Sequence, residues 1–362
     1  MSDEHWLASV VAAFCVEGEL ESARRYGSGH IHHTYAVRFQ VPARREHILL
    51  QRINTRIFTN PIPLMENIER VTKHIWSRII GLPDAERRVL RLISARDGKP
   101  WHVDLEQNYW RAYRFIEGAC TFDQAASPGQ VFEAAKAFGR FQQMLEDLPS
   151  ERIAETIPDF HYTPKRFANF QRAVDQDEAK RGHRAQSEIA SAISRRAIAG
   201  LLADTGLPLR VTHNDTKLNN VMLDDETGEG ICVIDLDTVM PGLVAYDFGD
   251  MVRTMTCPAA EDEQDLSRVV MQFPLFEAVL RGYLAGAGNC LTCEERESLI
   301  PGAKVIVFEQ GIRFLADYLN GDKYYRVSRP EQNLDRCRTQ FKLLESIEQQ
   351  ENAMARLLRT LR

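Results

Sequence analysis

Alternating apolar and polar residues mark two neighbouring stretches near the start of the chain. Residues 31–41 carry apolar side chains at a spacing of two, and residues 47–53 repeat this pattern, which predicts two half-buried strands. Pro42 begins a short polar turn between them, so the pair predicts a hairpin. Before the hairpin, residues 4–20 contain an apolar run that we expect to form a first helix.

The spacing of apolar residues then becomes helical. Residues 64–80 place five apolar side chains on one helix face: Leu64, Ile68, Val71, Ile75 and Ile79. Residues 89–94 and 109–116 predict two further strands, separated by a turn at Asp97-Gly98. The first third of the chain therefore predicts a small, β-rich unit.

Beyond Gly118 the pattern is mainly helical, with one β-rich segment at 209–236. We expect helices at 129–147, 163–176, 184–204, 274–286, 294–319 and 330–360. The predicted fold is α+β and bilobal, with a small β-rich N-terminal lobe (1–117) and a larger, mainly helical C-terminal lobe (118–362). The apolar face of the last helix suits packing against the large lobe better than a dimer seam, so we expect a monomer.

Composition narrows the partners. The chain has 362 residues, of which 44% are hydrophobic and 27% charged, as in an ordinary soluble globular protein. A net charge of −6 argues against general nucleic-acid binding. Seven cysteines, including a lone Cys290-x-x-Cys293, indicate reduced thiols rather than a disulfide framework or a zinc site. We see no signal peptide or membrane-spanning run, and we expect a cytoplasmic protein without a membrane partner.

The segment that carries chemistry runs from Val211 to Asp235. It contains His213-x-Asp215, then Asn220 five residues after the aspartate, and Asp235 after a short apolar strand. A hairpin-like turn at 224–230 lies between Asn220 and Asp235, so the two residues are expected to meet at the ends of one hairpin.

Phosphoryl transfer uses these residue types. A carboxylate orients the incoming hydroxyl, and an Asn and a second Asp hold magnesium, which prefers oxygen ligands. We therefore assign Asp215 as the catalytic carboxylate and Asn220 and Asp235 as metal ligands, with His213 as a brace of the loop. Each residue alone would be an ordinary cap, turn or buried side chain, but their combined spacing favours a kinase-like site.

Three motifs resemble those of the aminoglycoside phosphotransferase and choline kinase superfamily: His213-Asn-Asp-Thr-Lys-Leu-Asn-Asn, Val233-Ile-Asp-Leu-Asp-Thr-Val-Met-Pro-Gly and Tyr246-Asp-Phe-Gly-Asp. Within it, the chain is most similar to the N-acetylhexosamine 1-kinase branch, from about Gly27 to Tyr325. The resemblance implies a protein-kinase-like fold, ATP, Mg²⁺ and phosphorylation of a sugar at its anomeric hydroxyl. It also implies that Asp247 and Asp250 brace the catalytic loop.

The nucleotide is expected in the N-terminal lobe. Gly27, Ser28 and Gly29 precede a strand and suit a phosphate-covering loop. The lysine that kinases carry on the third strand is absent, and Arg52, which alternates with Ile48 and Leu50, is the candidate replacement. Glu66 or Glu69 is the candidate partner for that arginine. By fold analogy, the backbone at Phe115, Ile116 and Glu117 holds adenine.

The acceptor site is placed by the resemblance alone. It implies sugar contacts from His33, Thr34, Arg313 and Tyr324, beside Asp215, and Lys217 is expected to contact either the sugar or the transferred phosphate. Where the family often has Asn-Asp, this chain has His32-His33, which leaves its preference among sugars open.

Three hypotheses follow. The first is an ATP-dependent kinase that phosphorylates O1 of N-acetylglucosamine or N-acetylgalactosamine. The second is a phosphotransferase acting on another small hydroxylated molecule, such as an aminoglycoside, an amino alcohol or another sugar. The third is a pseudokinase that serves as a binding module, which the absent strand lysine favours and the intact Asp215, Asn220 and Asp235 oppose.

Overall fold

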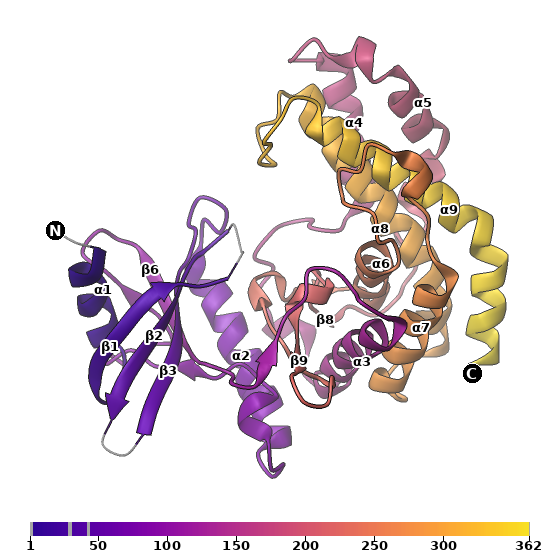
Figure 1. Ribbon diagram of the computed structural model, residues 1–362. Coiled ribbons are helices and arrows are strands. Elements are labelled where there is room, and N and C mark those ends of the chain that lie inside the picture. The colour runs from indigo at the N-terminus through magenta and orange to yellow at the C-terminus, as the bar shows by residue number, and fades with distance from the viewer. Residues whose placement is uncertain (1–2, 28–30, 42–43, 362) are drawn as a thin grey trace.

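The computed structural model describes residues 3–27, 31–41 and 44–361. It has two lobes, a sheet-rich N-terminal lobe and a mainly helical C-terminal lobe (Figure 1). This is the predicted protein-kinase-like architecture. The strands are β1 (Glu19–Arg25), β2 (His33–Val41), β3 (Arg44–Arg52), β4 (Leu92–Ile93), β5 (His102–Val103), β6 (Tyr109–Arg114), β7 (Ala119–Cys120), β8 (Arg210–Thr212), β9 (Val221–Asp224), β10 (Gly230–Val233) and β11 (Met240–Gly242).

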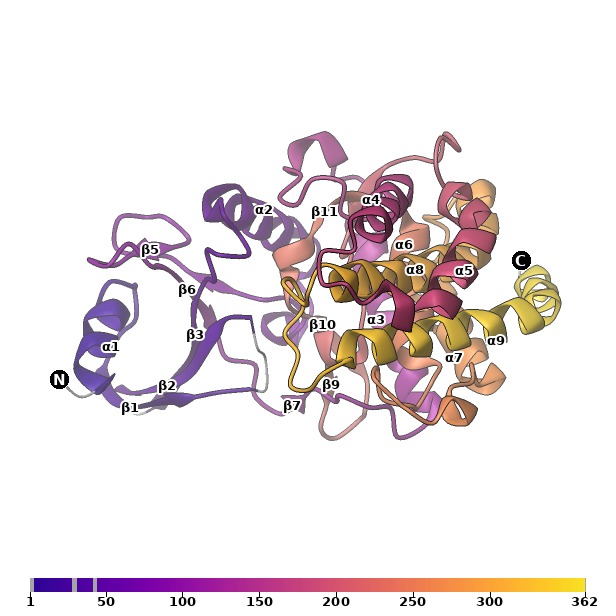
Figure 2. The same cartoon turned by 90° about the horizontal axis from the view of Figure 1, so that it is seen from above.

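The N-terminal lobe is built on one antiparallel sheet with the order β1-β2-β3-β6-β4, and β5 also pairs with β6. Its two faces bury different helices. Ile48 and Leu50 of β3 and Trp110 of β6 pack with Phe14, which follows α1 (Asp3–Ala12). The opposite face packs against α2 (Pro61–Ile79), which lies between the sheet and the C-terminal lobe in Figure 2. Alternation along β3 therefore decides which side chains face α2.

The chain passes from one lobe to the other just after β6. That strand ends at Arg114, and β7 already pairs with β9 of the C-terminal lobe. Gly118, the predicted boundary, lies between them with a φ of 66°, a backbone conformation that favours glycine.

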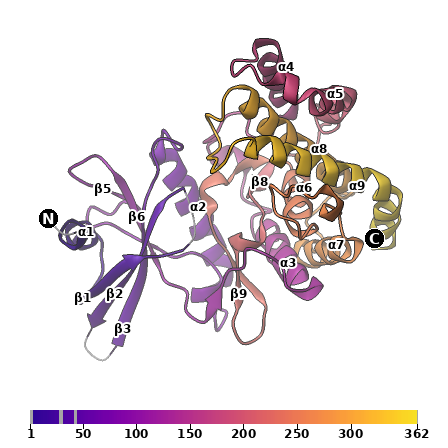
Figure 3. The same ribbon diagram turned by 45° about the horizontal axis from the view of Figure 1, so that its top comes forward.

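The C-terminal lobe contains α3 (Pro128–Met144), α4 (Thr163–Gln176), α5 (Gln186–Ser194), α6 (Val244–Met255), α7 (Phe273–Ala287), α8 (Cys293–Leu319) and α9 (Gln332–Thr360). Two small sheets, β10-β9-β7 and β11-β8, lie on the side of this lobe that faces α2 (Figure 3). The loop that joins α8 to α9 reaches back toward the N-terminal lobe (Figure 2). None of the helices in the described ranges is both long and apolar enough to cross a membrane.

Several predicted elements differ from the structure. The expected helix 4–20 ends at Ala12, and Glu19 already begins β1, whose charged residues hid the strand from the apolar pattern. The strand expected at 89–94 is only Leu92–Ile93. The helix expected at 184–204 is split into α5 and a 3₁₀ turn at Arg196–Gly200. Helix α6 was not expected, because its buried carboxylates interrupt the apolar spacing.

Helices α6 and α8 cross at two glycines. A Cβ atom on Gly302 would lie 2.2 Å from the carbonyl oxygen of Ala245, and one on Gly249 would lie 2.4 Å from that of Gly302. Only hydrogen side chains permit this approach, so backbone packing fixes the position of α6, which carries Asp247 and Asp250.

Gly302→Ala should therefore destabilise the protein by about 1–3 kcal/mol, because the methyl group overpacks a contact between two backbones. Gly200→Ala is the matched control, since a Cβ there meets no atom within 4 Å. Urea unfolding of both variants measures the difference. Equal stabilities would contradict a tight crossing.

Candidate active site

The loop after β8 is held by the ring of His213, which is fully buried. The backbone N–H of Asp215 donates to its Nδ1 at 3.3 Å, so the other ring nitrogen carries the hydrogen. That Nε2 lies 2.9 Å from the carbonyl oxygen of Ile234, to which it donates. His213 thus ties the residue before Asp235 to the loop that carries Asp215, as its predicted role of brace requires.

Asp247, in the first turn of α6, provides a second brace. Its carboxylate accepts the backbone N–H groups of His213 at 2.9 Å and Asn214 at 2.7 Å. Asn214 has a φ of 63°, so these bonds hold a left-handed residue directly before Asp215. The brace expected of Asp247 is confirmed. Asp250 instead accepts from Arg253 Nε at 2.8 Å within α6.

Asp215, Lys217 and Asn220 converge. Asn220 Nδ2 donates to Asp215 Oδ2 at 3.1 Å, and Lys217 Nζ lies 2.9 Å from the same oxygen. Burial would raise the pKa of the Asp215 carboxyl, but Lys217, with a smaller effect from Arg253, holds it below its ordinary value. The carboxylate is therefore ionised at neutral pH and fixed in place.

Asp235 lies beside this group. It has a φ of 59°, and the preceding N–H of Ile234 donates to the carbonyl oxygen of Asn220 at 2.9 Å. Burial, with the nearby carboxylates of Asp237 and Asp215, raises the pKa of Asp235 to about 7. Excess negative charge at this point suits a divalent cation, and Asn220, whose Nδ2 donates, accepts no hydrogen bond at Oδ1 within the described ranges 3–27, 31–41 and 44–361.

Two residues after Asp235, Asp237 contacts residues that the sequence analysis did not select. Arg111 of β6 binds both of its oxygens, and the distance from Nη2 to Oδ2 is 2.8 Å. His32 Nε2 donates to Oδ2 at 2.7 Å. These residues were missed because an arginine in a strand and a histidine before one carry no local signal.

The predicted nucleotide residues of the N-terminal lobe are partly described. Gly27 has a φ of 77°, while Ser28 and Gly29 lie outside the described residues. Arg52 shares a sheet face with Ile48 and Leu50, and its Nη2 lies 3.3 Å from the ring nitrogens of His33. The role predicted for Arg52 stays a prediction.

The proposed helix partners of Arg52 lie elsewhere. Glu69 pairs with Lys73 at 2.7 Å on α2, and Glu66 is exposed. Among the residues that the structure describes, neither glutamate forms an ion pair with Arg52. Thr34, which was predicted to contact the acceptor, lies on the opposite face of the sheet from Arg52. Its hydroxyl oxygen accepts from Gln51 Nε2 at 3.0 Å.

The linker between the lobes is rigid. Phe115 stacks on His47 with ring centroids 3.8 Å apart, and Ile116 is buried in the core. The side chain of Glu117 accepts from His47 at 2.9 Å, while its carbonyl oxygen accepts from Arg87 Nε at 3.0 Å. The three residues predicted to hold adenine therefore form one ordered stretch.

A row of arginines leads away from Asp215. Arg253 influences the pKa of both Asp215 and Arg313. Burial, and then the charge of Arg313, lowers the pKa of Arg166. Arg166 donates to the carbonyl oxygen of Phe160 and Arg313 to Gln310 Oε1, and in the described part of the chain neither is paired with a carboxylate. This side of the site therefore carries a row of guanidinium groups, with the buried carboxylate of Glu309 near Arg166 and Arg313.

Lys217 and Arg253 also line a cavity of about 260 Å³. Glu261, which lies 3.3 Å from Arg253 Nη1, forms part of the same wall. The space beside the catalytic loop is thus bordered by polar and charged groups on the C-terminal lobe.

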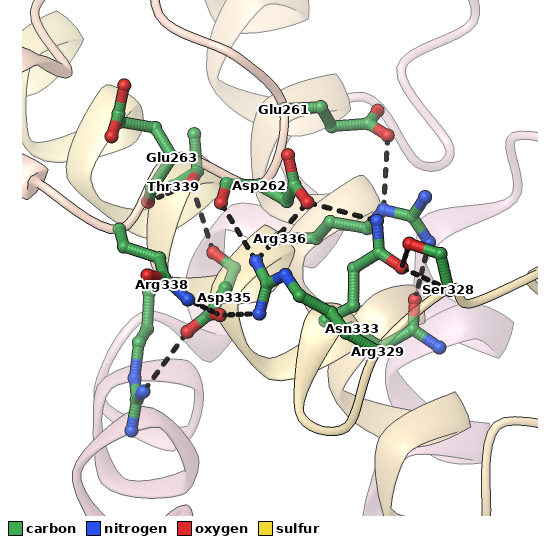
Figure 4. Close-up of polar contacts among 12 residues, drawn as sticks. Glu261, Asp262, Glu263, Ser328, Arg329, Asn333, Asp335, Arg336, Arg338 and Thr339 are labelled. Atoms are coloured by element: carbon green, nitrogen blue, oxygen red, sulfur yellow. Dashed lines mark hydrogen bonds and ion pairs between the residues drawn. The ribbon is translucent and has the colours of Figure 1, made fainter.

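Side chains at the start of α9 contact residues 261–263 and Arg329 of the loop between α8 and α9 (Figure 4). Arg336 lies 3.5 Å from Glu261 and donates to Asn333 Oδ1 at 2.9 Å. Asn333 in turn donates to Asp317, whose carboxylate accepts the backbone N–H groups of Tyr324 and Tyr325. The ring of Tyr324 remains 68% exposed.

Residues 23–284 match the phosphotransferase enzyme family. The chain belongs to this family. It is an ATP-dependent phosphotransferase with a hydroxyl group as acceptor.

Solved structures similar to this phosphotransferase share its fold at low identity. An aminoglycoside phosphotransferase from Alicyclobacillus acidocaldarius has a TM-score of 0.65 at 12% identity and covers 98% of this chain and 96% of its own. Spectinomycin phosphotransferase, in complex with ADP and spectinomycin, has a TM-score of 0.57 at 13% identity, with 96% and 99% covered. A choline/ethanolamine kinase family protein from Mesorhizobium loti has a TM-score of 0.54 at 15% identity, with 99% and 98% covered.

In this phosphotransferase, Asp247→Ala should lower the free energy of unfolding by about 3 kcal/mol, because two buried N–H groups lose a charged acceptor. The control is Asp265→Ala, whose carboxylate caps an exposed turn at Ser267, and whose effect should be much smaller. Urea unfolding compares the two. Equal losses would contradict the special role given to Asp247.

Proposed function

We propose that this phosphotransferase transfers the γ-phosphoryl group of ATP to the anomeric hydroxyl of an N-acetylhexosamine, giving the sugar 1-phosphate and ADP. The nucleotide lies in the N-terminal lobe (1–117), against Gly27, Ser28, Gly29 and the linker 115–117. The sugar lies against the C-terminal lobe (118–362), with His33 and Thr34 contributing from the sheet.

The catalytic step follows from the ionised state of Asp215. Its carboxylate orients the O1 hydroxyl and accepts its proton as the oxygen bonds to the γ-phosphorus, while the bond from that phosphorus to the β–γ bridging oxygen of ATP breaks. The lowered pKa makes Asp215 a weak base. That suits a loose transition state, in which the proton leaves late, and an anomeric hydroxyl, which is more acidic than other sugar hydroxyls.

Asn220 and Asp235 would hold Mg²⁺. The amide oxygen of Asn220 and the carboxylate of Asp235 offer two oxygen ligands beside a buried excess of negative charge. When bound, the ion neutralises charge on the phosphate oxygens. Lys217, paired with Asp215 at 2.9 Å, is placed to contact the transferred phosphoryl group or the sugar.

The cationic row Arg253–Arg313–Arg166 is the observation that favours a sugar over an amine-bearing acceptor. Similar structures include an aminopropanol kinase and an ethanolamine kinase, whose named compounds carry an amino group. Guanidinium groups would repel such a cation but donate well to hydroxyl and acetamido oxygens. Arg313 is thus proposed to bind the sugar, with Tyr324 beside it.

Asp215→Asn should lower turnover by about 10²–10⁴-fold, because the amide cannot accept the hydroxyl proton, while ADP affinity stays near the wild-type value. Asp204→Asn, at an exposed loop aspartate, is the control and should be fully active. Steady-state kinetics and ADP titration measure both effects. A folded Asp215→Asn variant with wild-type turnover would refute the catalytic assignment.

Phosphorus NMR should detect a sugar 1-phosphate from N-acetylglucosamine or N-acetylgalactosamine, and not from plain hexoses, choline or an aminoglycoside.

Arg313→Ala or Tyr324→Ala should raise the KM for the sugar about 10-fold or more and leave the KM for ATP nearly unchanged, since each removes an acceptor contact. Arg172→Ala, on the exposed side of α4, is the control. Turnover of a non-sugar alcohol without any hexosamine would instead support the second hypothesis.

A further inference from the structure

The N-terminal lobe has a buried cation, but it is not on the third strand. Kinases pair a lysine of that strand with a glutamate of the following helix. Here Lys73 pairs with Glu69 and Lys99 with Asp97, both on exposed surface. Arg111, on the neighbouring strand β6, is only 2% exposed and faces the C-terminal lobe through Asp237.

The hydrogen-bond partners of Arg111 in the described part of the chain are charged or polar, and its guanidinium also lies 5.5 Å from the ring centre of Tyr113. Both terminal nitrogens donate to the two oxygens of Asp237, and Nε donates to Gln51 Oε1 at 2.9 Å. Asp237 is 3% exposed, so the pair is shielded from water on both sides. Nε, Nη1 and Nη2 of Arg111 each already donate to Gln51 or Asp237. We therefore expect Arg111 to hold Asp237 and not to bind phosphate.

Two more residues of the N-terminal lobe hold the same short segment. The N–H of Asn54 donates to His32 Nδ1 at 3.1 Å, so His32 Nε2 carries the hydrogen that it donates to Asp237. Asn67, buried on α2, donates to the carbonyl oxygens of Val239 at 3.1 Å and Ala154 at 2.8 Å. We call Arg111, His32 and Asn67, with segment 235–239, the interlobe clasp.

The clasp encloses Asp235. On one side, Ile234 is fixed by Asn220 and by His213. On the other, Asp237 and Val239 are held from the N-terminal lobe. Asp235 itself has a left-handed backbone beside two other carboxylates, a conformation and a charge that need support from their surroundings.

We propose that Arg111 is a positioning residue for the metal site: through Asp237 it holds the Asp235 carboxylate toward Asn220. The inference rests on the proposed assignment of Asn220 and Asp235 as metal ligands. Partners that orient a metal ligand typically change metal affinity by about 10–100-fold when removed.

The test is Mn²⁺ binding to the full-length protein saturated with ADP, measured by electron paramagnetic resonance. Arg111→Gln should weaken Mn²⁺ binding about 10–100-fold and leave metal-free ADP affinity within about 3-fold. Arg111→Lys, which keeps the charge but loses the fork, should fall between this variant and the wild type. If Arg111→Gln does not fold, the Mn²⁺ affinity of Arg111→Lys serves as the test.

Arg210→Gln is the matched control. Arg210 also forms a two-pronged bond with a buried carboxylate, Glu295, at 2.8 Å for both contacts, but within the C-terminal lobe. Arg210→Gln should lower Tm as Arg111→Gln does, but it should leave the Mn²⁺ affinity unchanged.

The outcomes separate the proposals. Wild-type Mn²⁺ affinity in the Arg111 variants would overturn the positioning role. A loss of metal-free ADP affinity instead would make Arg111 a nucleotide contact and also overturn it. Asp235→Asn with wild-type Mn²⁺ affinity would overturn the metal assignment and this inference with it. Because the measurement needs no acceptor, failure to phosphorylate an N-acetylhexosamine would refute only the substrate.

Discussion

Crowding of negative charge is the constraint on which this active site depends. The carboxylates of Asp237 and Asp215 lie close enough to Asp235 to raise its pKa, with Asp237 buried and Asp215 partly exposed. Buried carboxylates persist as charges only when they are paired. The structure gives Asp215 a lysine from its own loop and Asp237 an arginine from the other lobe. Asp235 is left with the unbalanced charge, at the place where a cation is proposed to bind.

The pairing of Asp237 with Arg111 links the two lobes. Burial would raise the pKa of Asp237, but Arg111 and His32 hold it well below its ordinary value, so the contact between the lobes is a true ion pair. An ion pair without access to water transmits position more strictly than an apolar contact, since its geometry allows few alternatives. The sheet of the N-terminal lobe and the catalytic segment of the C-terminal lobe therefore set each other's positions.

The sequence predicted the parts of the site whose neighbours are close in the chain. His213, Asp215 and Asn220 lie within eight residues, and a hairpin brings Asp235 to them, so spacing was sufficient. Arg111 and Asp237 are 126 residues apart, and their pairing depends on how two lobes dock. Alternation along β3 correctly predicted that Arg52 shares a sheet face with Ile48 and Leu50. It did not show that these two residues pack toward α1. Which face meets the other lobe is a property of tertiary packing, and no local pattern contains it.

The same distinction applies to the acceptor side. The arginine row draws on three helices, α4, α6 and α8, and is held through the start of α9. Arg253 was not selected from the sequence, where Asp250 three residues before it has the spacing of an ordinary exposed helix pair. In the fold that pair is buried beside Asp215, so its remaining charge is felt by the catalytic carboxylate and by Arg313. Two carboxylates, Asp250 and Glu261, hold Arg253, whereas the hydrogen-bond acceptors of Arg166 and Arg313 among the described residues are neutral. Guanidinium groups held in this way keep donors for oxygen-rich molecules, and this physical difference would separate an acceptor of hydroxyl and carbonyl groups from an amine.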